Sequence, residues 1–266
     1  DKNLHVVFCD VGQGDASLII KGSFQMVIDG GPSGEGLLSC LGKHVPFWDR
    51  QIEVVVNTHP QKDHLGGLDD LVERYRVEKL VINGVFGGGK DGERLQNYVN
   101  DRSINLVIPR EGDVLRVGSL QFDILWPAER VGSELAWNSE SRVQPVVRVE
   151  PVMAVLGRNT DVNVVSVVGV LRYGKFKVMF TGDIGFDEEK KIKLEDVDVL
   201  KVAHHGSKYS SGDEFIKKTD PEVAVIQVGK NTFGHPTKET LGKLEKVGAK
   251  IFRTDLDGEV EIISDG

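Results

Sequence analysis

The sequence predicts an α/β protein built as a four-layer αββα sandwich, with two sheets packed face to face and helices on the outside. The main observation is a repeated order: each half of the chain starts with β-rich runs and then alternates strands with helices. The 266 residues include 39% hydrophobic residues and 31 glycines, which suits a large core joined by many tight turns. No linker, internal repeat or low-complexity segment separates the halves, so we expect a single domain over residues 1–266.

The elements of the first half follow from residue type, periodicity and turn residues. Val, Ile, Leu and Phe form short runs between glycine-containing turns, which is typical of strands. A polar stretch from Thr58 to His64 directly follows one of these runs. The expected strands cover residues 4–9, 16–20, 25–28, 52–56, 79–82 and 105–108, the expected helices 67–76 and 92–101, and a hairpin joins 114–117 to 120–125.

The same criteria predict the elements of the second half, which follows an irregular stretch. Residues 127–161 mix charge, Gly, Pro and Trp137 without clean periodicity, and a loop of this length is often functional. Within it, residues 145–149 are the segment that could pair as a strand. The expected strands are 164–172, 176–180, 197–203, 223–228, 251–252 and 259–263, and the expected helices are 213–218 and 237–247.

Composition excludes several classes of protein. A formal net charge of −8 argues against a broad basic face for nucleic acid, so any anion-binding charge is expected to be local, for example a metal ion. No apolar run approaches the length of a membrane-spanning helix. Because the chain begins at Asp1 rather than Met, we expect a trimmed or processed product, and a lost signal or membrane portion stays an open alternative.

The two cysteines leave the redox compartment open. Cys9 lies in an apolar run and is interpreted as a small buried hydrophobe. Cys40 lies in an expected helix. A disulfide between the two is possible, but no feature of the sequence argues for it.

Histidines gather at the ends of expected strands, where α/β folds build their sites. The first group holds His59, Asp63 and His64 in one short turn, and imidazole and carboxylate ligands suit zinc or manganese. Asp183 ends another apolar strand, in a place that suits a carboxylate shared by two cations, although a plain turn aspartate also fits there.

Three later histidines complete the candidate set. His204 and His205 are adjacent and point in different directions, so at most one is expected to bind metal, and the other binds substrate or supports the ligands. His235 precedes an expected helix and suits a metal ligand, a general acid or a phosphate contact.

These motifs resemble, in order, those of the metallo-β-lactamase fold, and more narrowly those of the C-terminal hydrolase domain of ComEC competence proteins and its stand-alone relatives. The resemblance implies an αββα sandwich with a metal site at one edge of the two sheets, and a metal-dependent hydrolase. For the ComEC type it implies a DNA nuclease or phosphodiesterase that acts in DNA uptake during natural competence. The matching segments are 10–16 (DVGQGDA), 28–32 (IDGGP), 59–67 (HPQKDHLGG), 125–127 (LWP), 181–183 (TGD), 204–207 (HHGS), 234–236 (GHP) and 253–258 (RTDLDG).

Carried over residue by residue, the resemblance assigns His59, Gln61, Asp63 and His64 to the first metal motif, Asp183 to the bridging carboxylate, and His204 or His205 to the later ligand. It places Asp29 behind the ligands as a supporting acid. This sequence has Gln61 where the family has His or Asp, and it lacks a histidine between His64 and His204, a gap for which Asn163 is the candidate substitute.

These departures predict unequal sites. The first, of His59, Gln61 and Asp183, is weakened because a neutral amide is a poorer ligand than imidazole or carboxylate. The second, of Asp63, His64, Asp183 and one of the paired histidines, is intact. We expect one or two ions of zinc or manganese.

In the expected reaction, water attacks a phosphodiester in line. Asp63 or Asp183 accepts a proton, and His235 with the second paired histidine holds the phosphate or protonates the leaving oxygen. The residues expected to bind substrate are Gln13, Asp15, Ser207 and Lys208.

Two other functions stay open, a small-molecule phosphodiester or ester hydrolase and a degenerate relative that binds DNA or a partner without catalysis. The expected partners are DNA, as a single strand or one strand of a duplex, and the rest of a membrane channel protein. The chain is expected to be a monomer. Its expected location is outside the cytoplasmic membrane if it derives from a ComEC-type protein, and otherwise the cytoplasm or the exterior.

Overall fold

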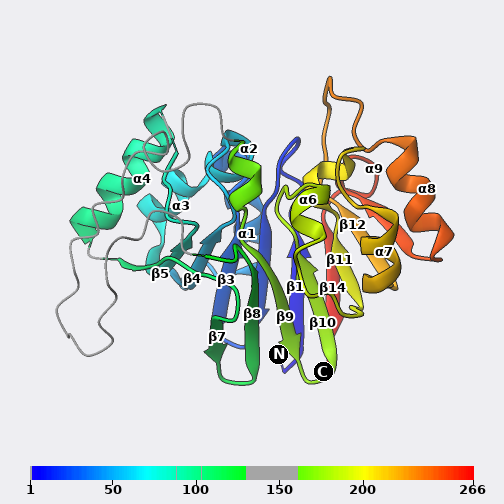
Figure 1. Cartoon of the computed structure of the whole chain (residues 1–266). Helices are drawn as coiled ribbons and strands as arrows, with labels where there is room; N and C mark the ends of the chain where they lie inside the picture. Colours follow the sequence, from blue (N-terminus) through cyan, green and yellow to red (C-terminus); the bar gives the residue numbers. More distant parts are fainter. Residues whose placement is uncertain (1, 88, 103, 130–160) are drawn as a thin grey trace.

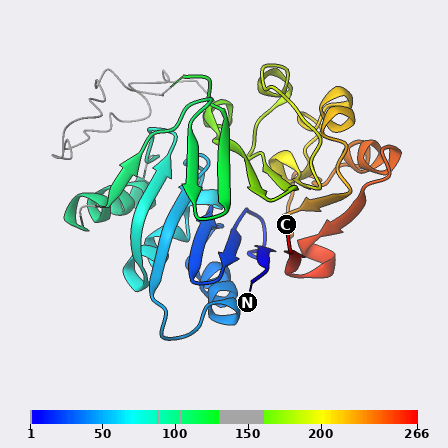
Figure 2. The ribbon, with the colours of Figure 1, turned by 90° about the horizontal axis from the view of Figure 1, so that it is seen from below.

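Two seven-stranded sheets face each other between outer helices in the computed structural model (Figure 1), which describes residues 2–87, 89–102, 104–129 and 161–266. The strand order of the first sheet is β14-β1-β2-β3-β4-β5-β6, and that of the second is β13-β12-β11-β10-β9-β8-β7. The view from below separates the two sheets and their flanking helices (Figure 2). The predicted four-layer αββα sandwich is therefore confirmed.

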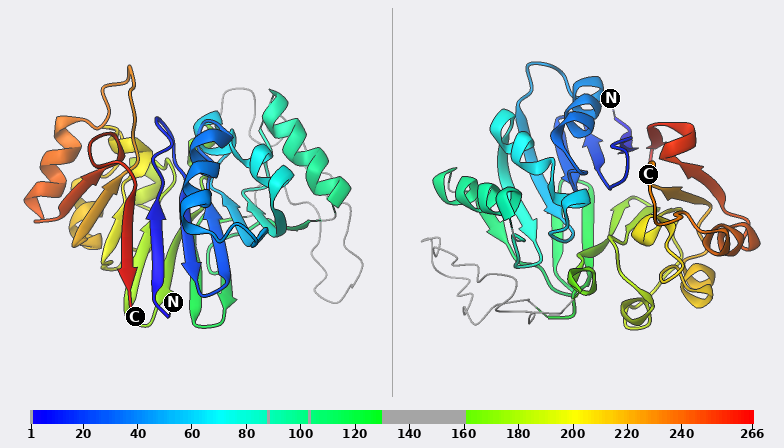
Figure 3. Two further views of the ribbon diagram at one scale, coloured as in Figure 1. Left: turned by 180° about the vertical axis from the view of Figure 1, so that it is seen from behind. Right: turned by 90° about the horizontal axis from the view of Figure 1, so that it is seen from above.

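The first sheet is antiparallel from β14 to β3 and parallel from β3 to β6. The last strand of the chain, β14, pairs with the first, β1, so that the two ends of the chain lie side by side (Figure 3). The strands are β1 (Leu4–Phe8), β2 (Ser17–Lys21), β3 (Phe24–Ile28), β4 (Gln51–Asn57), β5 (Arg76–Ile82), β6 (Asn105–Val107) and β14 (Val260–Ser264).

The second sheet is antiparallel from β7 to β10 and parallel from β10 to β13. Parallel strands bring their carboxyl ends to one edge of a sheet, and the loops beyond those ends build sites. The strands are β7 (Val114–Val117), β8 (Leu120–Trp126), β9 (Val168–Tyr173), β10 (Phe176–Phe180), β11 (Val199–Lys201), β12 (Val223–Ile226) and β13 (Lys250–Arg253).

Helices cover the outer faces of both sheets (Figure 3). The first sheet carries α1 (Gly34–His44), α3 (Leu68–Arg74) and α4 (Gly89–Arg102), whereas α7 (Asp213–Thr219) and α8 (Lys238–Lys246) flank the second. Short helical turns lie in the connecting loops. These are α2 (Lys62–Leu65), α6 (Phe186–Glu189), α9 (Thr254–Asp257) and the 3₁₀ turns η1 (Val162–Val165) and η2 (Ala203–Gly206).

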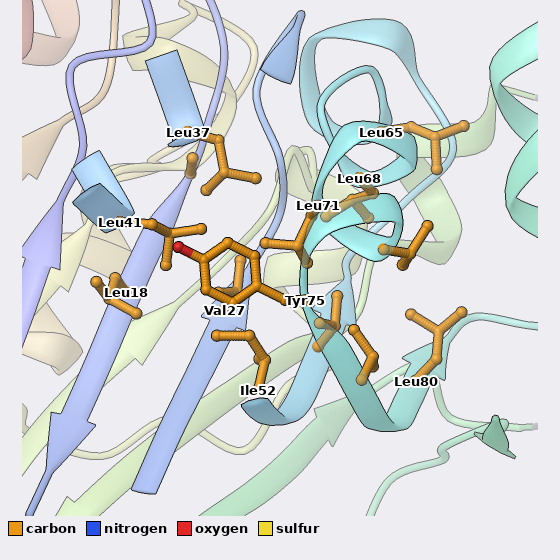
Figure 4. Close-up of a cluster of buried hydrophobic side chains, with 14 of the residues drawn as sticks. Leu18, Val27, Leu37, Leu41, Ile52, Leu65, Leu68, Leu71, Tyr75 and Leu80 are labelled. Atoms are coloured by element: carbon orange, nitrogen blue, oxygen red, sulfur yellow. The ribbon is translucent and has the colours of Figure 1, made fainter. Parts of the chain in front are cut away.

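Three apolar clusters hold the layers together. Between the sheets, Phe8 stacks on Phe180 with ring centroids 5.9 Å apart. On the outer face of the first sheet, the leucines of α1 and α3 pack around Tyr75 (Figure 4). A third cluster joins the second sheet to α7 and α8, including Phe215 and Leu244. Full burial of each large apolar side chain contributes about 1.5–3 kcal/mol, so these clusters supply the main stabilisation of the sandwich.

Some predicted elements differ from the structure. The run expected as a strand from Val164 instead begins as η1, and β9 starts only at Val168. The physical reason is a local cap, because the Asp161 carboxylate accepts a hydrogen bond from Asn163 N (3.0 Å) and turns the backbone before the strand. The short helices α2, α6 and α9 were not predicted. The segment 145–149, considered as a strand, and Trp137 lie outside the described residues.

Cys9 and Cys40 form a disulfide, with Cα atoms 5.8 Å apart. The interpretation of Cys9 as only a buried hydrophobe was therefore wrong, although the residue is fully buried. The bond joins the end of β1 to α1, two elements that only the tertiary fold brings together. In the part of the chain that the structure describes, no helix is both long enough and apolar enough to cross a membrane.

Candidate metal centre

The first metal motif lies directly beyond the carboxyl end of β4. The chain leaves the strand at Asn57 and bends at Thr58 and His59, and after Gln61 the helix α2 places Asp63 and His64 in its single turn. Two backbone hydrogen bonds fix this turn, from Asp15 N to Asp63 O (3.0 Å) and from Gly30 N to His64 O (2.6 Å). The loops after β1 and β3 therefore hold the motif in place.

Asp29 organises this motif from beneath. It is buried, with a positive φ of 60°, and its carboxylate accepts hydrogen bonds from Thr58 N (2.7 Å) and Thr58 Oγ1 (2.7 Å). It also accepts from His64 Nδ1 (2.8 Å). Because Nδ1 donates to this carboxylate, Nε2 is the ring nitrogen of His64 that is left to bind a metal, and it faces Asp183 Oδ2 at 3.3 Å.

Asp183 enters from the second sheet, three residues after the end of β10. Ser166 Oγ accepts a hydrogen bond from its backbone N (3.3 Å), and the side chain is 1% exposed. Neither carboxylate oxygen has a hydrogen-bond partner in the part of the chain that the structure describes. The carboxylate instead faces His64, His205 Nε2 (3.5 Å) and Lys201 Nζ (3.7 Å), so it lies at the junction of the two sheets.

The two adjacent histidines separate into an inner and an outer residue. Both have left-handed backbone conformations in η2, with φ of 51° and 53°. His205 is buried, and its Nδ1 donates to the Gln227 carbonyl (2.8 Å), which directs Nε2 toward Asp63 Oδ2 (3.3 Å). His204 is 31% exposed at its side chain and stands 3.9 Å from Asp183 Oδ2. The geometry thus favours His205 as the ligand.

Four groups have the spacing of a metal site. One ligand atom from each of Asp63, His64, Asp183 and His205 lies within 4.8 Å of the others. Among the described residues, Nε2 of His64, both oxygens of Asp183 and Nε2 of the neighbouring His59 are buried without a hydrogen-bond partner. Buried polar atoms without partners are costly unless something binds them. The residues present therefore fit a divalent cation.

His59 and Gln61, assigned to the first site, lie at the edge of this set. The ring of His59 is buried, with its centroid 4.0 Å from that of His64, and its Nδ1 is 3.1 Å from Thr58 Oγ1. Burial lowers the pKa of His59 to about 3, so the ring is neutral and able to bind a metal. Gln61 is half-buried at the start of α2. Asn163 is buried in η1, and its Oδ1 has no partner.

A buried lysine completes the electrostatics of the centre, and sequence reasoning missed it. Lys201 is 2% exposed; it forms an ion pair with Asp15 and donates to the Gly182 carbonyl (3.1 Å). Burial would raise the pKa of Asp15, but Lys201, His205 and His64 hold it at about 2. The available signal was a single charged residue inside the apolar run 199–203.

In the absence of a cation the two inner histidines carry protons. Burial opposes protonation, yet the carboxylates of Asp183 and Asp15 raise the pKa of His205 to about 10. Burial likewise opposes protonation of His64, but Asp183 and Asp29 raise its pKa well above the ordinary value. A divalent cation that binds these rings therefore displaces protons.

The residues predicted to bind substrate differ in how far they are buried. Asp15 is buried against Lys201, and Gln13 Oε1 accepts a hydrogen bond from Gly229 N (3.2 Å). Ser207 is buried, and its Oγ accepts from Tyr209 N (3.3 Å). Lys208 is exposed, with its Nζ 4.9 Å from the centre of the ring of Tyr209.

His235 lies outward from the metal cluster. Its ring centroid is 5.7 Å from that of His204, and its Nδ1 has no hydrogen-bond partner. Burial, with the nearby His204 and His205, lowers the pKa of His235. The structure thus places His204 and His235 together beside the metal cluster, on the side away from the core.

Comparisons with known proteins agree with this geometry. The family model described as "Metallo-beta-lactamase superfamily" matches residues 9–230. The chain belongs to the metallo-β-lactamase superfamily. Among curated members, it is 28% identical over 217 residues to ComE operon protein 3 of Bacillus subtilis, covering 80% of this chain and 24% of that protein. It is 26% identical over 259 residues to Recombination protein 2 of Haemophilus influenzae, covering 95% of this chain and 28% of that protein.

Solved structures of the superfamily share the fold. Igni18 of Ignicoccus hospitalis, described as a novel metallo hydrolase, superposes with a TM-score of 0.58 at 19% identity, covering 97% of this chain and 98% of that one. YhfI of Bacillus subtilis, described as a metallo-β-lactamase fold protein, gives a TM-score of 0.58 at 13% identity, covering 99% and 100%. The chain spans only 24% to 32% of the length of its curated competence relatives.

Proposed function

We propose that this chain is a metal-dependent phosphodiesterase of the ComEC type that hydrolyses DNA. The observation that carries the proposal is the cluster of Asp63, His64, Asp183 and His205, in which His64 Nε2 and both Asp183 oxygens are buried without a hydrogen-bond partner among the described residues. The two sheets contribute to it equally, because Asp63 and His64 follow β4 whereas Asp183 and His205 follow β10 and β11. The fold therefore assembles the cluster only when the sandwich closes.

The charge balance of the cluster supports a divalent ion. Four carboxylates converge there, those of Asp15, Asp29, Asp63 and Asp183, and among the described residues one ammonium group, that of Lys201, pairs with two of them, Asp15 and Asp183. Concentrated buried negative charge is unfavourable unless positive charge compensates it, and the raised pKa values of His64 and His205 provide two protons that do so in the metal-free protein. A divalent cation would replace those protons, and it would neutralise the phosphoryl oxygens of a substrate and lower the pKa of water.

The four residues of the cluster differ in their access to solvent. The side chain of Asp63 is 30% exposed, whereas that of Asp183 is 1% exposed. Asp63 is therefore the member able to accept a proton from an attacking water, and Asp183 serves as a buried ligand. The role of holding the phosphate, or of protonating the leaving oxygen, falls to His204 and His235, which lie on the outer side.

The proposed biological setting is DNA uptake. It rests on similarity to proteins named for competence and recombination, of which this chain covers about a quarter to a third. The Cys9–Cys40 disulfide suits an oxidising compartment, such as the outer side of the cytoplasmic membrane. Within that setting, the remainder of a membrane channel protein is the proposed partner.

Cleavage of a labelled single-stranded DNA oligomer, with manganese or zinc, tests the proposal. The wild-type chain is expected to cleave it, and Asp183→Ala to abolish cleavage while leaving the fold largely intact. Asp187→Ala is the matched control, because this aspartate is exposed on the nearby α6 and pairs with the exposed Lys190. Hydrolysis of soluble phosphodiesters or esters without DNA cleavage would point to a small-molecule enzyme. No hydrolysis by the metal-loaded chain would refute the proposal.

A further inference from the structure

The loop between β12 and α8 presents a phenylalanine to solvent. Phe233 is 72% exposed, and the loop projects from the same end of the sheets as α2 (Figure 1). A single exposed apolar residue is common on protein surfaces and by itself indicates nothing. The hydrogen bonds, ring contacts and charges around Phe233 distinguish it from such a residue.

The loop is held in one shape by a single side chain. Asn231 Nδ2 donates to the carbonyls of Gly229 (2.9 Å) and His235 (2.9 Å). Asn231 Oδ1 accepts from Phe233 N (3.1 Å) and His235 N (3.1 Å). All four bonds close the turn around the amide, so Phe233 is exposed on an ordered turn.

Further contacts fix this turn to the metal centre. Thr237 N donates to the carbonyl of Gly206 (2.9 Å), in the segment that carries the paired histidines. Gly229 N donates to Gln13 Oε1 (3.2 Å). A Cβ on Gly229 would lie 2.4 Å from the carbonyl carbon of Gly12, so the backbones of the two loops are in direct contact. The position of Phe233 relative to the site is therefore set by backbone packing.

An unbroken series of ring contacts leads from the metal cluster to Phe233. Ring centroids are 5.5 Å apart for His64 and His205, and 6.2 Å apart for His205 and His204. The series continues from His204 to His235 at 5.7 Å, and from His235 to Phe233 at 5.8 Å. Burial decreases along it, from the buried His64 to the exposed Phe233. A phosphate at His204 would thus be two ring contacts from Phe233.

The local charge favours a polyanion despite the acidic composition. The chain has 41 Asp and Glu residues, yet the segments 204–209 and 229–236 contain none. They carry Lys208 and Lys230 instead, and both lysines are exposed. Exposed aromatic rings between cationic groups are how proteins hold single strands, with bases stacked on the rings and phosphates near the cations.

We propose that Phe233 is a positioning residue that stacks on an unpaired nucleobase of a single-stranded nucleic acid whose neighbouring phosphate lies at the metal centre. This inference rests on the proposed phosphodiesterase function and specifies its substrate as a strand with free base faces. In a duplex each base is already stacked and paired, so its face is available to Phe233 only after unstacking, which costs a few kcal/mol.

Binding of base-bearing and base-free strands tests the stacking directly. The probes are a fluorescein-labelled oligothymidylate of about twelve nucleotides and an abasic strand with the same phosphates. Fluorescence anisotropy is measured with metal removed by chelator, so that no strand is cleaved. The wild-type chain is expected to bind the base-bearing strand about 5- to 150-fold more tightly, the range for one stacked base.

Three variants separate stacking from other effects. Phe233→Ala is expected to bind both strands with nearly equal affinity, and Phe233→Trp to keep the preference for bases. Phe47→Ala is the matched control, because Phe47 is 78% exposed but precedes β4, at the opposite end of that strand from His59. It is expected to keep the wild-type preference.

The inference is overturned if Phe233→Ala keeps the full preference, or if the wild-type chain binds both strands equally. Tighter binding of a duplex, with no effect of Phe233→Ala, would also overturn it and would indicate a double-stranded ligand. The proposed phosphodiesterase function fails by a different result, the absence of cleavage by the metal-loaded wild-type chain. The binding preference can be present or absent independently of that outcome.

Discussion

Replacing Lys201 by methionine probes the electrostatics of the metal centre. Methionine has a similar length but no charge, so Lys201→Met leaves the packing of β11 largely filled while removing the ammonium group. The change breaks the ion pair with Asp15, removes a hydrogen bond to the Gly182 carbonyl, and takes away a positive charge 3.7 Å from Asp183 Oδ1.

The burial of the Lys201–Asp15 pair determines how much stability Lys201→Met loses. Both members of the Lys201–Asp15 pair are at most 3% exposed, so the remaining carboxylate cannot be hydrated. Removal of one partner of a buried ion pair lowers the free energy of unfolding by about 3–5 kcal/mol. The lower part of this range is expected, because His205 Nδ1 stays 3.2 Å from Asp15 Oδ1 and partly compensates the charge.

Equilibrium urea unfolding of the metal-free protein measures this loss. The Asp15→Asn, Lys201→Met double variant is expected to be more stable than Lys201→Met alone, because it removes the buried carboxylate that Lys201→Met leaves without its ammonium partner. Lys190→Met serves as the control: its ion pair with Asp187 joins two exposed side chains, and the loss is expected to stay below about 1 kcal/mol. A loss below about 1 kcal/mol for Lys201→Met, or a double variant less stable than the single one, would refute the reasoning.

Three further predictions concern the metal and the disulfide. Gln61→Asp is expected to raise the number of manganese or zinc ions bound per chain, measured by elemental analysis, because a carboxylate replaces a weak amide ligand; an unchanged stoichiometry would count against a ligand role for residue 61. In the metal-free protein the pKa of His205 is about 10 and that of His64 is raised as well, so both are protonated at neutral pH. Metal affinity, measured by competition with a chromophoric chelator, should therefore rise as the pH increases toward 10, by up to about tenfold per pH unit for each proton displaced, and a flat profile would contradict this. Cys40→Ser opens a loop with a sequence separation of 31, so the free energy of unfolding in urea is expected to fall by about 3–4 kcal/mol, whereas reductant should destabilise only the wild-type chain.

The fold and the grouping of the main candidate ligands could be predicted because their signals are local. Short apolar runs separated by glycine-containing turns identify the strands, and polar residues directly after those runs identify the edge at which the site lies. Asp63, His64 and Asp183 follow strands in this way, and the structure brings all three together. These motifs occur in the same order as in the family, and that resemblance linked them to a metal site.

The features that sequence reasoning missed depend on contacts between distant segments. The preference for His205 over His204 depends on the carbonyl of Gln227, which directly follows β12 and fixes the ring of His205. Lys201 meets Asp15 only after the sheets pack face to face. The Cys9–Cys40 bond likewise needs α1 to cross β1. None of these pairings leaves a periodic or compositional trace in the sequence.

The 3₁₀ turn η1 was missed for a different reason, because local hydrogen bonds override β-propensity there. Residues 164–172 are rich in valine, so their β-propensity predicts one long strand. The Asp161 cap on Asn163 and the bond from Ser166 N to the Asn163 carbonyl (3.0 Å) turn the first part of this run instead. The same turn places Ser166 next to Asp183, whose backbone N donates a hydrogen bond to Ser166 Oγ. The segment that is not a strand, against its β-propensity, therefore helps to position Asp183.

Elemental analysis of wild-type, His204→Ala and His205→Ala chains, each loaded with manganese or zinc, tests the central claim most directly. The claim is that Asp63, His64, Asp183 and His205 hold a divalent cation. It predicts about one or two ions per wild-type chain, retention of the cluster's ion in His204→Ala, and its loss in His205→Ala. A wild-type chain that binds no ion after loading would contradict it, as would a His205→Ala chain that keeps the wild-type metal content.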